Sequence, residues 1–258
     1  MEKKKNDFIA QGSILAIASI LVRVMGMIYR IPMTAIIGDK GNGFYSYAYS
    51  VYTILLLLSS YSLPLAVSKM VSAKAQLGQW RNVKRVFICA IAFAIGIGTT
   101  FGLIVLIGAQ FFTRVFFHSE LAAIALRFMA PTILIMALLG VFRGFFQGLQ
   151  NTLPTAVSQI VEGLINAIMS VVFAYFLFDF GHGMDAAGGT TDLGYAWGAA
   201  GGAIGTGAGA LAGLIFCLFC LWHTEKFLQL ILAVIRQEHS RSMAIFFVLC
   251  FLLHFQLS

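Results

Sequence analysis

The chain has 258 residues, of which 60% are hydrophobic and only 10% are charged, and its mean hydropathy is +0.90. Ordinary soluble domains carry about 25% charged residues, so this composition excludes a soluble globular fold and predicts that lipid surrounds most of the protein. The net charge of +7 is explained by membrane topology rather than by nucleic acid, because Lys and Arg concentrate in cytoplasmic loops.

Seven hydrophobic segments follow one another along the chain, and most are long enough to cross a hydrocarbon core of about 30 Å as a helix. Because backbone polar groups inside lipid are satisfied within helices, strands are not expected. The sequence therefore predicts an all-α, polytopic transmembrane helical bundle of about seven spans. The segments cover residues 8–37, 44–67, 86–112, 121–146, 155–178, 195–222 and 243–258, and the last is short for a span.

Charges between the segments predict the orientation of the chain. Basic residues gather at the N-terminus and between the second and third segments, where they are Lys3, Lys4, Lys5, Lys69, Lys74, Arg81, Lys84 and Arg85. These regions are expected on the cytoplasmic side. The gaps at 38–43, 113–120 and 179–194 are poor in positive charge and are expected outside, and Gly-rich residues 181–194 are expected to form a loop with little regular structure. A break at Gly78 predicts two short helices at the cytoplasmic surface between residues 68 and 85.

Two arginines lie within the first hydrophobic segment. An ionised side chain deep in a bilayer costs about 2.5–3.5 kcal/mol, so the presence of Arg23 and Arg30 inside a span calls for a physical explanation. They are seven residues apart, which places them on one helix face about 10 Å apart along the axis, and Gly26 lies between them. Stacked guanidinium groups in a water-lined cavity would bind phosphate. The alternative is that both arginines form structural ion pairs, for which Glu162 is the carboxylate clearly inside another span.

A polar stripe runs along the fifth segment at spacings of three or four residues, and such a stripe is expected to face the bundle interior or water. Its members are Thr155, Ser158, Gln159, Glu162, Asn166 and Ser170. Glu162, with Gln159 and Asn166, is a candidate to hold a coupling cation or proton. The alternative is that Glu162 completes a hydrogen-bond network or pairs with an arginine.

Other polar side chains have structural explanations. Tyr45, Tyr49 and Tyr52 are expected to be interface anchors, with a sugar-contacting wall as the alternative. Arg127 and Arg143 are expected to extend from the ends of the fourth segment to the membrane interface.

Glycines recur every fourth residue in the sixth segment, where they leave a groove for close helix packing, with a moving helix interface as the alternative. They are Gly201, Gly205, Gly209 and Gly213. All four cysteines lie in apolar segments, and the isolated Cys217-x-x-Cys220 spacing is weak evidence for metal. No metal site and no cofactor are therefore expected.

Three stretches resemble the polysaccharide transporter branch of the multidrug/oligosaccharidyl-lipid/polysaccharide exporters, especially the stage V sporulation protein B and lipid II flippase group. Residues 131–168 carry Arg-Gly-x-x-Gln-Gly from Arg143 to Gly148, followed by Pro-Thr-Ala and Ser-Gln-x-x-Glu. The other stretches are LVRVMGMIYRIPMTAIIG and LPLAVSKMVSAKAQLGQWRNVKRV. The resemblance extends from about Gln11 to Leu221.

This resemblance implies about fourteen helices in two pseudo-symmetric lobes around a cavity that opens alternately to either side. Residues 1–240 would form the N-terminal transmembrane lobe, with six spans and cytoplasmic loops, and residues 241–258 a truncated or aberrant seventh segment. In the lipid II flippases, arginines of the first helix line the cavity. The Arg-x-x-Gly from Arg23 to Gly26 matches directly, whereas the spacing to Arg30 is one residue longer, and Gly163 replaces the Gln that often follows the glutamate.

The expected function is therefore that of a flippase component in the bacterial plasma membrane, with a cytoplasmic N-terminus. It would move an anionic lipid-linked sugar, carried on undecaprenyl pyrophosphate, by alternating access. Its partners would be the bilayer, this substrate, a coupling cation or proton, and a second lobe or second copy, without nucleic acid.

Three alternatives stay open. A cation-coupled multidrug exporter would normally offer a carboxylate in its cavity. A membrane-bound glycosyltransferase would need paired acids at a membrane surface. Of these classes, a transporter is expected rather than an enzyme. A truncated fragment would insert without function.

Overall fold

The computed structural model describes residues 2–188 and 192–223, and the side chains of residues 12–186 and 192–223. These residues are helical, and the described part contains no strand, which confirms the predicted all-α class. The helices are α1 (Glu2–Ser60), α2 (Leu63–Gln76), α3 (Trp80–Phe117), α4 (Ala122–Gly148), α5 (Leu153–Gly188) and α6 (Leu193–His223). The predicted seventh segment, residues 243–258, lies outside the described residues, so the division at residue 240 remains a prediction.

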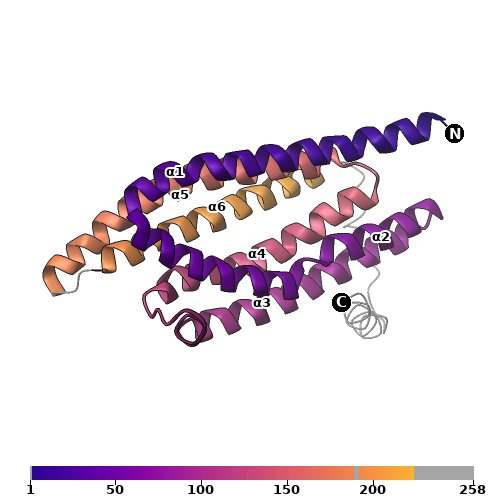
Figure 1. The fold of residues 1–258 in the computed structure, drawn as a ribbon. Helices are drawn as coiled ribbons and strands as arrows, with labels where there is room; N and C mark the ends of the chain where they lie inside the picture. Colours follow the sequence, from indigo (N-terminus) through magenta and orange to yellow (C-terminus); the bar gives the residue numbers. More distant parts are fainter. Residues whose placement is uncertain (1, 189–191, 224–258) are drawn as a thin grey trace.

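Five apolar helical stretches in the described residues are long enough to cross a membrane, which makes the chain a multi-pass membrane protein. The first stretch, Gly12–Gln76, is 65 residues long, more than one crossing requires. It contains a sharp kink at Gly38, whose φ of 64° lies in the left-handed region that glycine tolerates best. Figure 1 shows the first arm of α1 running to this kink and the second arm running back. The gap between the first two hydrophobic segments, residues 38–43, thus begins at a kink between two helical arms.

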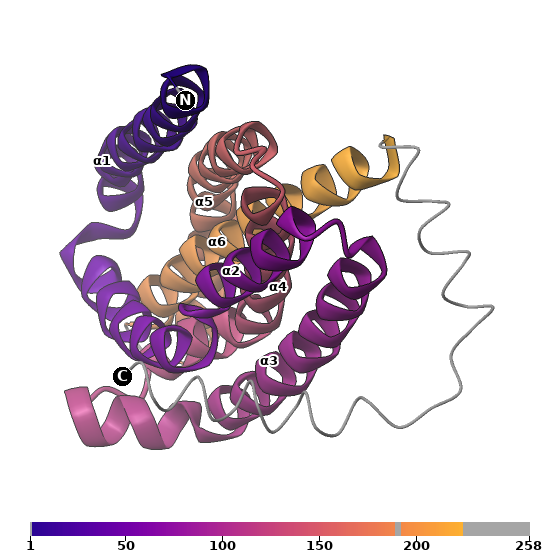
Figure 2. The ribbon, with the colours of Figure 1, turned by 90° about the vertical axis from the view of Figure 1, so that its right-hand side faces the viewer.

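The helix ends gather at two opposite ends of the bundle (Figure 1). One end holds the N-terminus, the α2–α3 turn and the α4–α5 turn, and the other holds the kink of α1, the α3–α4 turn and the ends of α5 and α6 that face each other. Viewed along this long direction, the first arm of α1 lies at the periphery of the bundle, on the opposite side of α5 from α3 (Figure 2).

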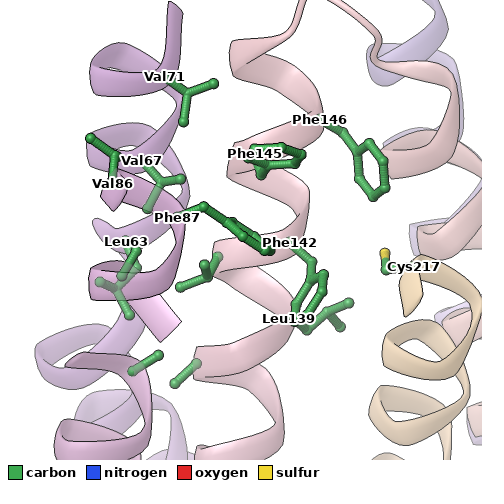
Figure 3. Close-up of a cluster of buried hydrophobic side chains, with 14 of the residues drawn as sticks. Leu63, Val67, Val71, Val86, Phe87, Leu139, Phe142, Phe145, Phe146 and Cys217 are labelled. Atoms are coloured by element: carbon green, nitrogen blue, oxygen red, sulfur yellow. The ribbon is translucent and has the colours of Figure 1, made fainter. Parts of the chain in front are cut away.

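A hydrophobic cluster fixes α2, α3, α4 and α6 at the end with the N-terminus. Figure 3 shows Phe142, Phe145 and Phe146 of α4 between α2 and α3 on one side and Cys217 of α6 on the other. The Phe87 ring of α3 lies 4.3 Å from the Phe145 ring, centroid to centroid. Glycines let α2 approach α4 closely: a Cβ atom at Gly144 would lie 2.5 Å from the carbonyl oxygen of Pro64.

At the opposite end, helical structure extends further than the sequence predicts. The expected loop at 181–194 is wrong for residues 181–188 and 193–194, because α5 continues to Gly188 and α6 begins at Leu193. The reason is close contact between the helices: a Cβ at Gly181 would lie 2.7 Å from the Cα of Gly194. Asp185 then accepts hydrogen bonds from the backbone N–H groups of Leu193 (3.0 Å) and Gly194 (2.9 Å), so a side chain of α5 caps the first turn of α6.

The kink of α1 rests on this same end of α6. A Cβ at Gly38 would lie 3.6 Å from the ring of Tyr195, and a Cβ at Gly41 would lie 3.2 Å from the carbonyl oxygen of Tyr195. Lys40 forms a 3.0 Å ion pair with Asp192. The turn between the two arms of α1 is therefore held against the start of α6.

Candidate functional site

Arg23 and Arg30 both lie on the first arm of α1, and both are exposed. Seven helical residues turn the chain by nearly two full rotations, so the two side chains leave the helix in almost the same direction. Neither takes part in an ion pair or hydrogen bond with another described residue. Apart from its two chain neighbours and the backbone of its own helix, no atom lies within 4 Å of the place where a Cβ of Gly26 would stand. The arm therefore presents two cations without protein counter-ions in the described part of the chain.

The neighbouring face of the same arm packs against α5. A Cβ at Gly163 would lie 3.2 Å from a methyl group of Val22 and 3.6 Å from the terminal methyl of Met25. Ser19 donates a 3.5 Å hydrogen bond to the amide oxygen of Gln159. The arginines thus sit beside the seam between α1 and α5, where the polar stripe of α5 begins.

The carboxylate of Glu162 is engaged by Arg143 of α4. The guanidinium Nη2 lies 2.7 Å from Oε2 of Glu162, and Nε donates a 2.9 Å hydrogen bond to Ser158. The Arg143 and Glu162 side chains are only 12% and 24% exposed. Ser158 in turn donates to the carbonyl oxygen of Thr155, and Thr155 donates to that of Arg143. This closed network joins α4 to α5 beside the turn that connects them.

The expectation that Arg143 reaches the membrane interface is therefore wrong. Arg143 and Ser158 lie at equal distances along the chain from the turn between α4 and α5, so antiparallel packing brings them together. That symmetric spacing around a short turn is a sequence signal that could have identified the pair. Glu162 is thereby unavailable as the counter-ion that a structural role for Arg23 and Arg30 would require. Arg127, by contrast, is exposed near the opposite end of α4.

The remaining polar side chains of α5 face different helices. Asn166 accepts a 2.8 Å hydrogen bond from the hydroxyl of Ser170, which also contacts the carbonyl oxygen of Gly202 in α6 at 3.3 Å. Gln159 faces α1, Glu162 faces α4, and Asn166 lies beside α6. The predicted stripe is continuous along α5, and its members contact three neighbouring helices.

The tyrosines of the second arm of α1 point mainly into the protein. Tyr45 and Tyr52 are buried, which makes the interface-anchor interpretation wrong for these two, whereas Tyr49 is exposed. The Tyr45 hydroxyl lies 3.4 Å from that of Thr206 in α6. The Tyr49 ring lies 5.8 Å from the Tyr45 ring and 5.9 Å from the Tyr52 ring. One exposed ring thus lies between two buried rings.

The glycine series of α6 faces α5 at backbone distance. A Cβ added at Gly201 would collide with the backbone of Phe173 and Ala174, and one at Gly205 with the backbone of Ser170. At Gly209 it would lie 2.6 Å from the carbonyl oxygen of Glu162. A Cβ at Gly213 would still lie 3.3 Å from the carbonyl oxygen of Ser158. The helix that carries Glu162 is therefore in direct main-chain contact with α6.

The arrangement offers unpaired positive charge on α1 and a neutralised carboxylate inside the bundle. An anion, above all a phosphate group that accepts forked hydrogen bonds, is the ligand that suits such arginines. In the part of the chain that the structure describes, no group of three His, Cys, Asp or Glu side chains is placed to hold a metal ion.

The sequence of this chain is similar to a known protein family and to curated relatives. The family model described as "Polysaccharide biosynthesis protein" matches residues 8–257. The chain is similar to three proteins of Bacillus subtilis (strain 168), each at 26% identity. Stage V sporulation protein B matches over 217 residues, 84% of this chain; Lipid II flippase MurJ over 221 residues, 83%; and Uncharacterized membrane protein YabM over 223 residues, 86%.

In each case the match covers 39% of the relative, so the chain spans about two fifths of the length of the curated relatives it matches. No solved structure matches the chain significantly.

Proposed function

The chain belongs to the polysaccharide biosynthesis protein family, and from this membership we propose that it forms part of a flippase for a lipid-linked sugar. The substrate would be a sugar carried on undecaprenyl pyrophosphate, such as a peptidoglycan precursor or a polysaccharide unit, moved across the bacterial plasma membrane by alternating access. The name of one relative, Lipid II flippase MurJ, supports this substrate class.

The observation that carries the proposal is the pair of exposed arginines on α1. Arg23 and Arg30 lie in a candidate membrane span and share one direction, and they have no counter-ion among the described residues. An uncompensated cation inside lipid is costly, and an anionic ligand would remove that cost. A pyrophosphate has enough acceptor oxygens for both guanidinium groups, and Gly26 leaves the space between them open.

The network on α5 would then influence the conformational equilibrium rather than hold the substrate. Arg143 and Glu162 tie α4 to α5, and the glycines of α6 join α5 to α6. Gln159 contacts the arm that carries the arginines. Substrate binding at α1 would shift these contacts, and a coupling cation or proton acting at Glu162 would compete with Arg143. A second lobe or a second copy would supply the opposing wall of the cavity.

A cation-coupled multidrug exporter is the less favoured alternative. Such a protein needs a carboxylate free to attract a cationic compound, whereas Glu162 lies 2.7 Å from Arg143. The sign of the unpaired charge on α1 favours an anionic substrate.

Ligand binding tests the proposal without requiring complete transport. The purified 258-residue chain in detergent is titrated with undecaprenyl pyrophosphate, and neutral undecaprenol serves as the comparison ligand. We expect Arg23→Gln or Arg30→Gln to weaken pyrophosphate binding roughly tenfold or more, because a charge-assisted hydrogen bond contributes about 1.5–3 kcal/mol. Arg23→Lys should weaken binding less, since it keeps the charge but loses the forked donors.

The matched control is Arg127→Gln, which removes an exposed arginine of a different helix, α4. It should leave binding unchanged. Equal affinity for the pyrophosphate and the neutral alcohol, or wild-type affinity in the Arg23→Gln/Arg30→Gln variant, would contradict the assignment of the site. Transport is tested separately by complementing a flippase-deficient strain with a full-length relative that carries the same substitutions.

A further inference from the structure

Basic residues are concentrated where α2 meets α3, a region called here the basic hairpin (residues 65–85). Its charged side chains are Lys69, Lys74, Arg81, Lys84 and Arg85. No Asp or Glu occurs anywhere between Asp39 and Glu120. In the described structure, Lys69, Lys74, Lys84 and Arg85 form no ion pair. The basic hairpin therefore carries a net positive charge that its own sequence does not compensate.

Large apolar side chains are exposed at the tip of the same hairpin. Leu77 is 67% exposed and Trp80 is 55% exposed, and they flank Gly78, whose φ of 68° turns the chain between the helices. More than half of each side chain is therefore left uncovered by the described residues. Tryptophan is enriched at membrane–water interfaces, because its ring is apolar while its N–H seeks a polar partner.

The position of the basic hairpin relative to the spans fits an interfacial location. Trp80 begins α3, which continues without interruption to Phe117 as an apolar candidate span. The Trp80 ring thus belongs to the first turn of a membrane helix. Lys84, one turn further, is buried, so the exposed side chains of Lys69, Arg81 and Arg85 are the cations that can meet the headgroups.

From this juxtaposition we propose that the basic hairpin is a docking surface for anionic phospholipid headgroups of the surrounding bilayer. Leu77 and Trp80 enter the boundary between headgroups and acyl chains, and the flanking cations attract the phosphate groups beside them. Basic segments next to membrane spans are attracted to anionic lipids by such electrostatics. The headgroups supply the negative charge that residues 40–119 lack.

Fluorescence of Trp80 tests the proposal in the full chain. The chain has three tryptophans, so Trp197→Phe and Trp222→Phe leave Trp80 as the sole reporter. This protein is reconstituted into vesicles of phosphatidylcholine and phosphatidylglycerol in equal parts. Two parallel samples are prepared. In one, only the phosphatidylglycerol carries bromine atoms near the start of its acyl chains, and in the other only the phosphatidylcholine does. We expect brominated phosphatidylglycerol to quench Trp80 at least about twofold more than brominated phosphatidylcholine.

Charge variants separate lipid selectivity from simple immersion in the bilayer. The triple variant Lys74→Gln/Arg81→Gln/Arg85→Gln should equalise quenching by the two lipids while Trp80 remains quenched. The charge-preserving variant Lys74→Arg/Arg81→Lys/Arg85→Lys should keep the preference, and raised salt should weaken it. Neutralising Arg114 and Arg127 at the opposite end of the bundle should leave the preference intact.

Three results would overturn the proposal. They are equal quenching by the two brominated lipids in the unmodified hairpin, a preference that survives neutralisation of the basic residues, and a Trp80 that neither lipid quenches. Circular dichroism of each variant confirms that its helices have formed, so a lost preference reports lost charge rather than unfolding. This surface is separate from Arg23 and Arg30, so its outcome is independent of pyrophosphate binding.

Discussion

Replacing Arg143 with methionine would remove the cation that joins α4 to α5. Methionine keeps a long apolar stem but loses both donors, the one to Glu162 at 2.7 Å and the one to Ser158 at 2.9 Å. Glu162 would then lose its ion-pair partner, although its side chain is only 24% exposed. The substitution therefore isolates the cost of an unpaired carboxylate between two membrane helices.

The expected loss is about 3 kcal/mol of unfolding free energy, the lower part of the range for removing one partner of a buried ion pair, because Glu162 keeps some exposure. Glu162→Gln should cost less, about 1–2 kcal/mol, since its amide oxygen still accepts a hydrogen bond from Arg143. The double variant Arg143→Met/Glu162→Gln should be more stable than the sum of the single losses predicts, by about 1–2 kcal/mol.

Reversible unfolding in mixed micelles of mild detergent and dodecyl sulfate, followed by circular dichroism, measures these differences. Arg114→Met is the matched control, because Arg114 lies 3.6 Å from Glu120 and the two side chains are 75% and 65% exposed. Exposed pairs contribute little, so the control should lose less than about 1 kcal/mol. Additive losses in the double variant, or equal losses for Arg143→Met and Arg114→Met, would refute the inference that the pair holds α4 against α5.

Three further substitutions test the packing of the helices. Gly205→Ala should destabilise the protein by about 1–3 kcal/mol because its Cβ meets the backbone of Ser170, whereas Gly96→Ala, with no neighbour within 4 Å, should be neutral or stabilising in the same unfolding assay. Gly38→Ala should cost about 1–2 kcal/mol because φ is positive there; a loss no larger than that of Gly96→Ala would contradict the kink. Asp185→Ala should cost about 1–2 kcal/mol and speed hydrogen exchange in the first turn of α6, since two backbone N–H groups lose their acceptor; unchanged exchange would argue against the cap.

Hydropathy was sufficient to predict the helical class and most helix positions, because a span must satisfy its own backbone in lipid. It failed where contacts between helices decide the outcome. The polar, Gly-rich residues 181–188 remain helical because Gly181 meets the backbone of α6 and Asp185 caps it. Glycines recur every fourth residue at Gly140, Gly144 and Gly148 of α4, where they face α2. This is the same signal as in α6, and it was available in the sequence.

The candidate site was predictable in part for a similar reason. The energetic cost of charge in lipid draws attention to Arg23, Arg30 and Glu162 whatever the fold. Hydropathy says nothing of pairing, so it could not decide between Arg143 and the α1 arginines as the partner of Glu162. It also could not decide which tyrosines face inward, because Tyr45 and Tyr52 have the same amphipathic character as an interface anchor.

The direct backbone contact between α5 and α6 restricts how these two helices can move relative to each other. Rotating α6 about its own axis by about 100°, the angle between successive helical residues, would bring Ile204 or Thr206 to the place where Gly205 meets Ser170, and neither side chain fits against a backbone. The contact therefore fixes which face of α6 is turned toward α5. A motion of α5 that displaces Glu162 and keeps this face-to-face contact would carry α6 along with it, and the kink at Gly38 lies outside the contact.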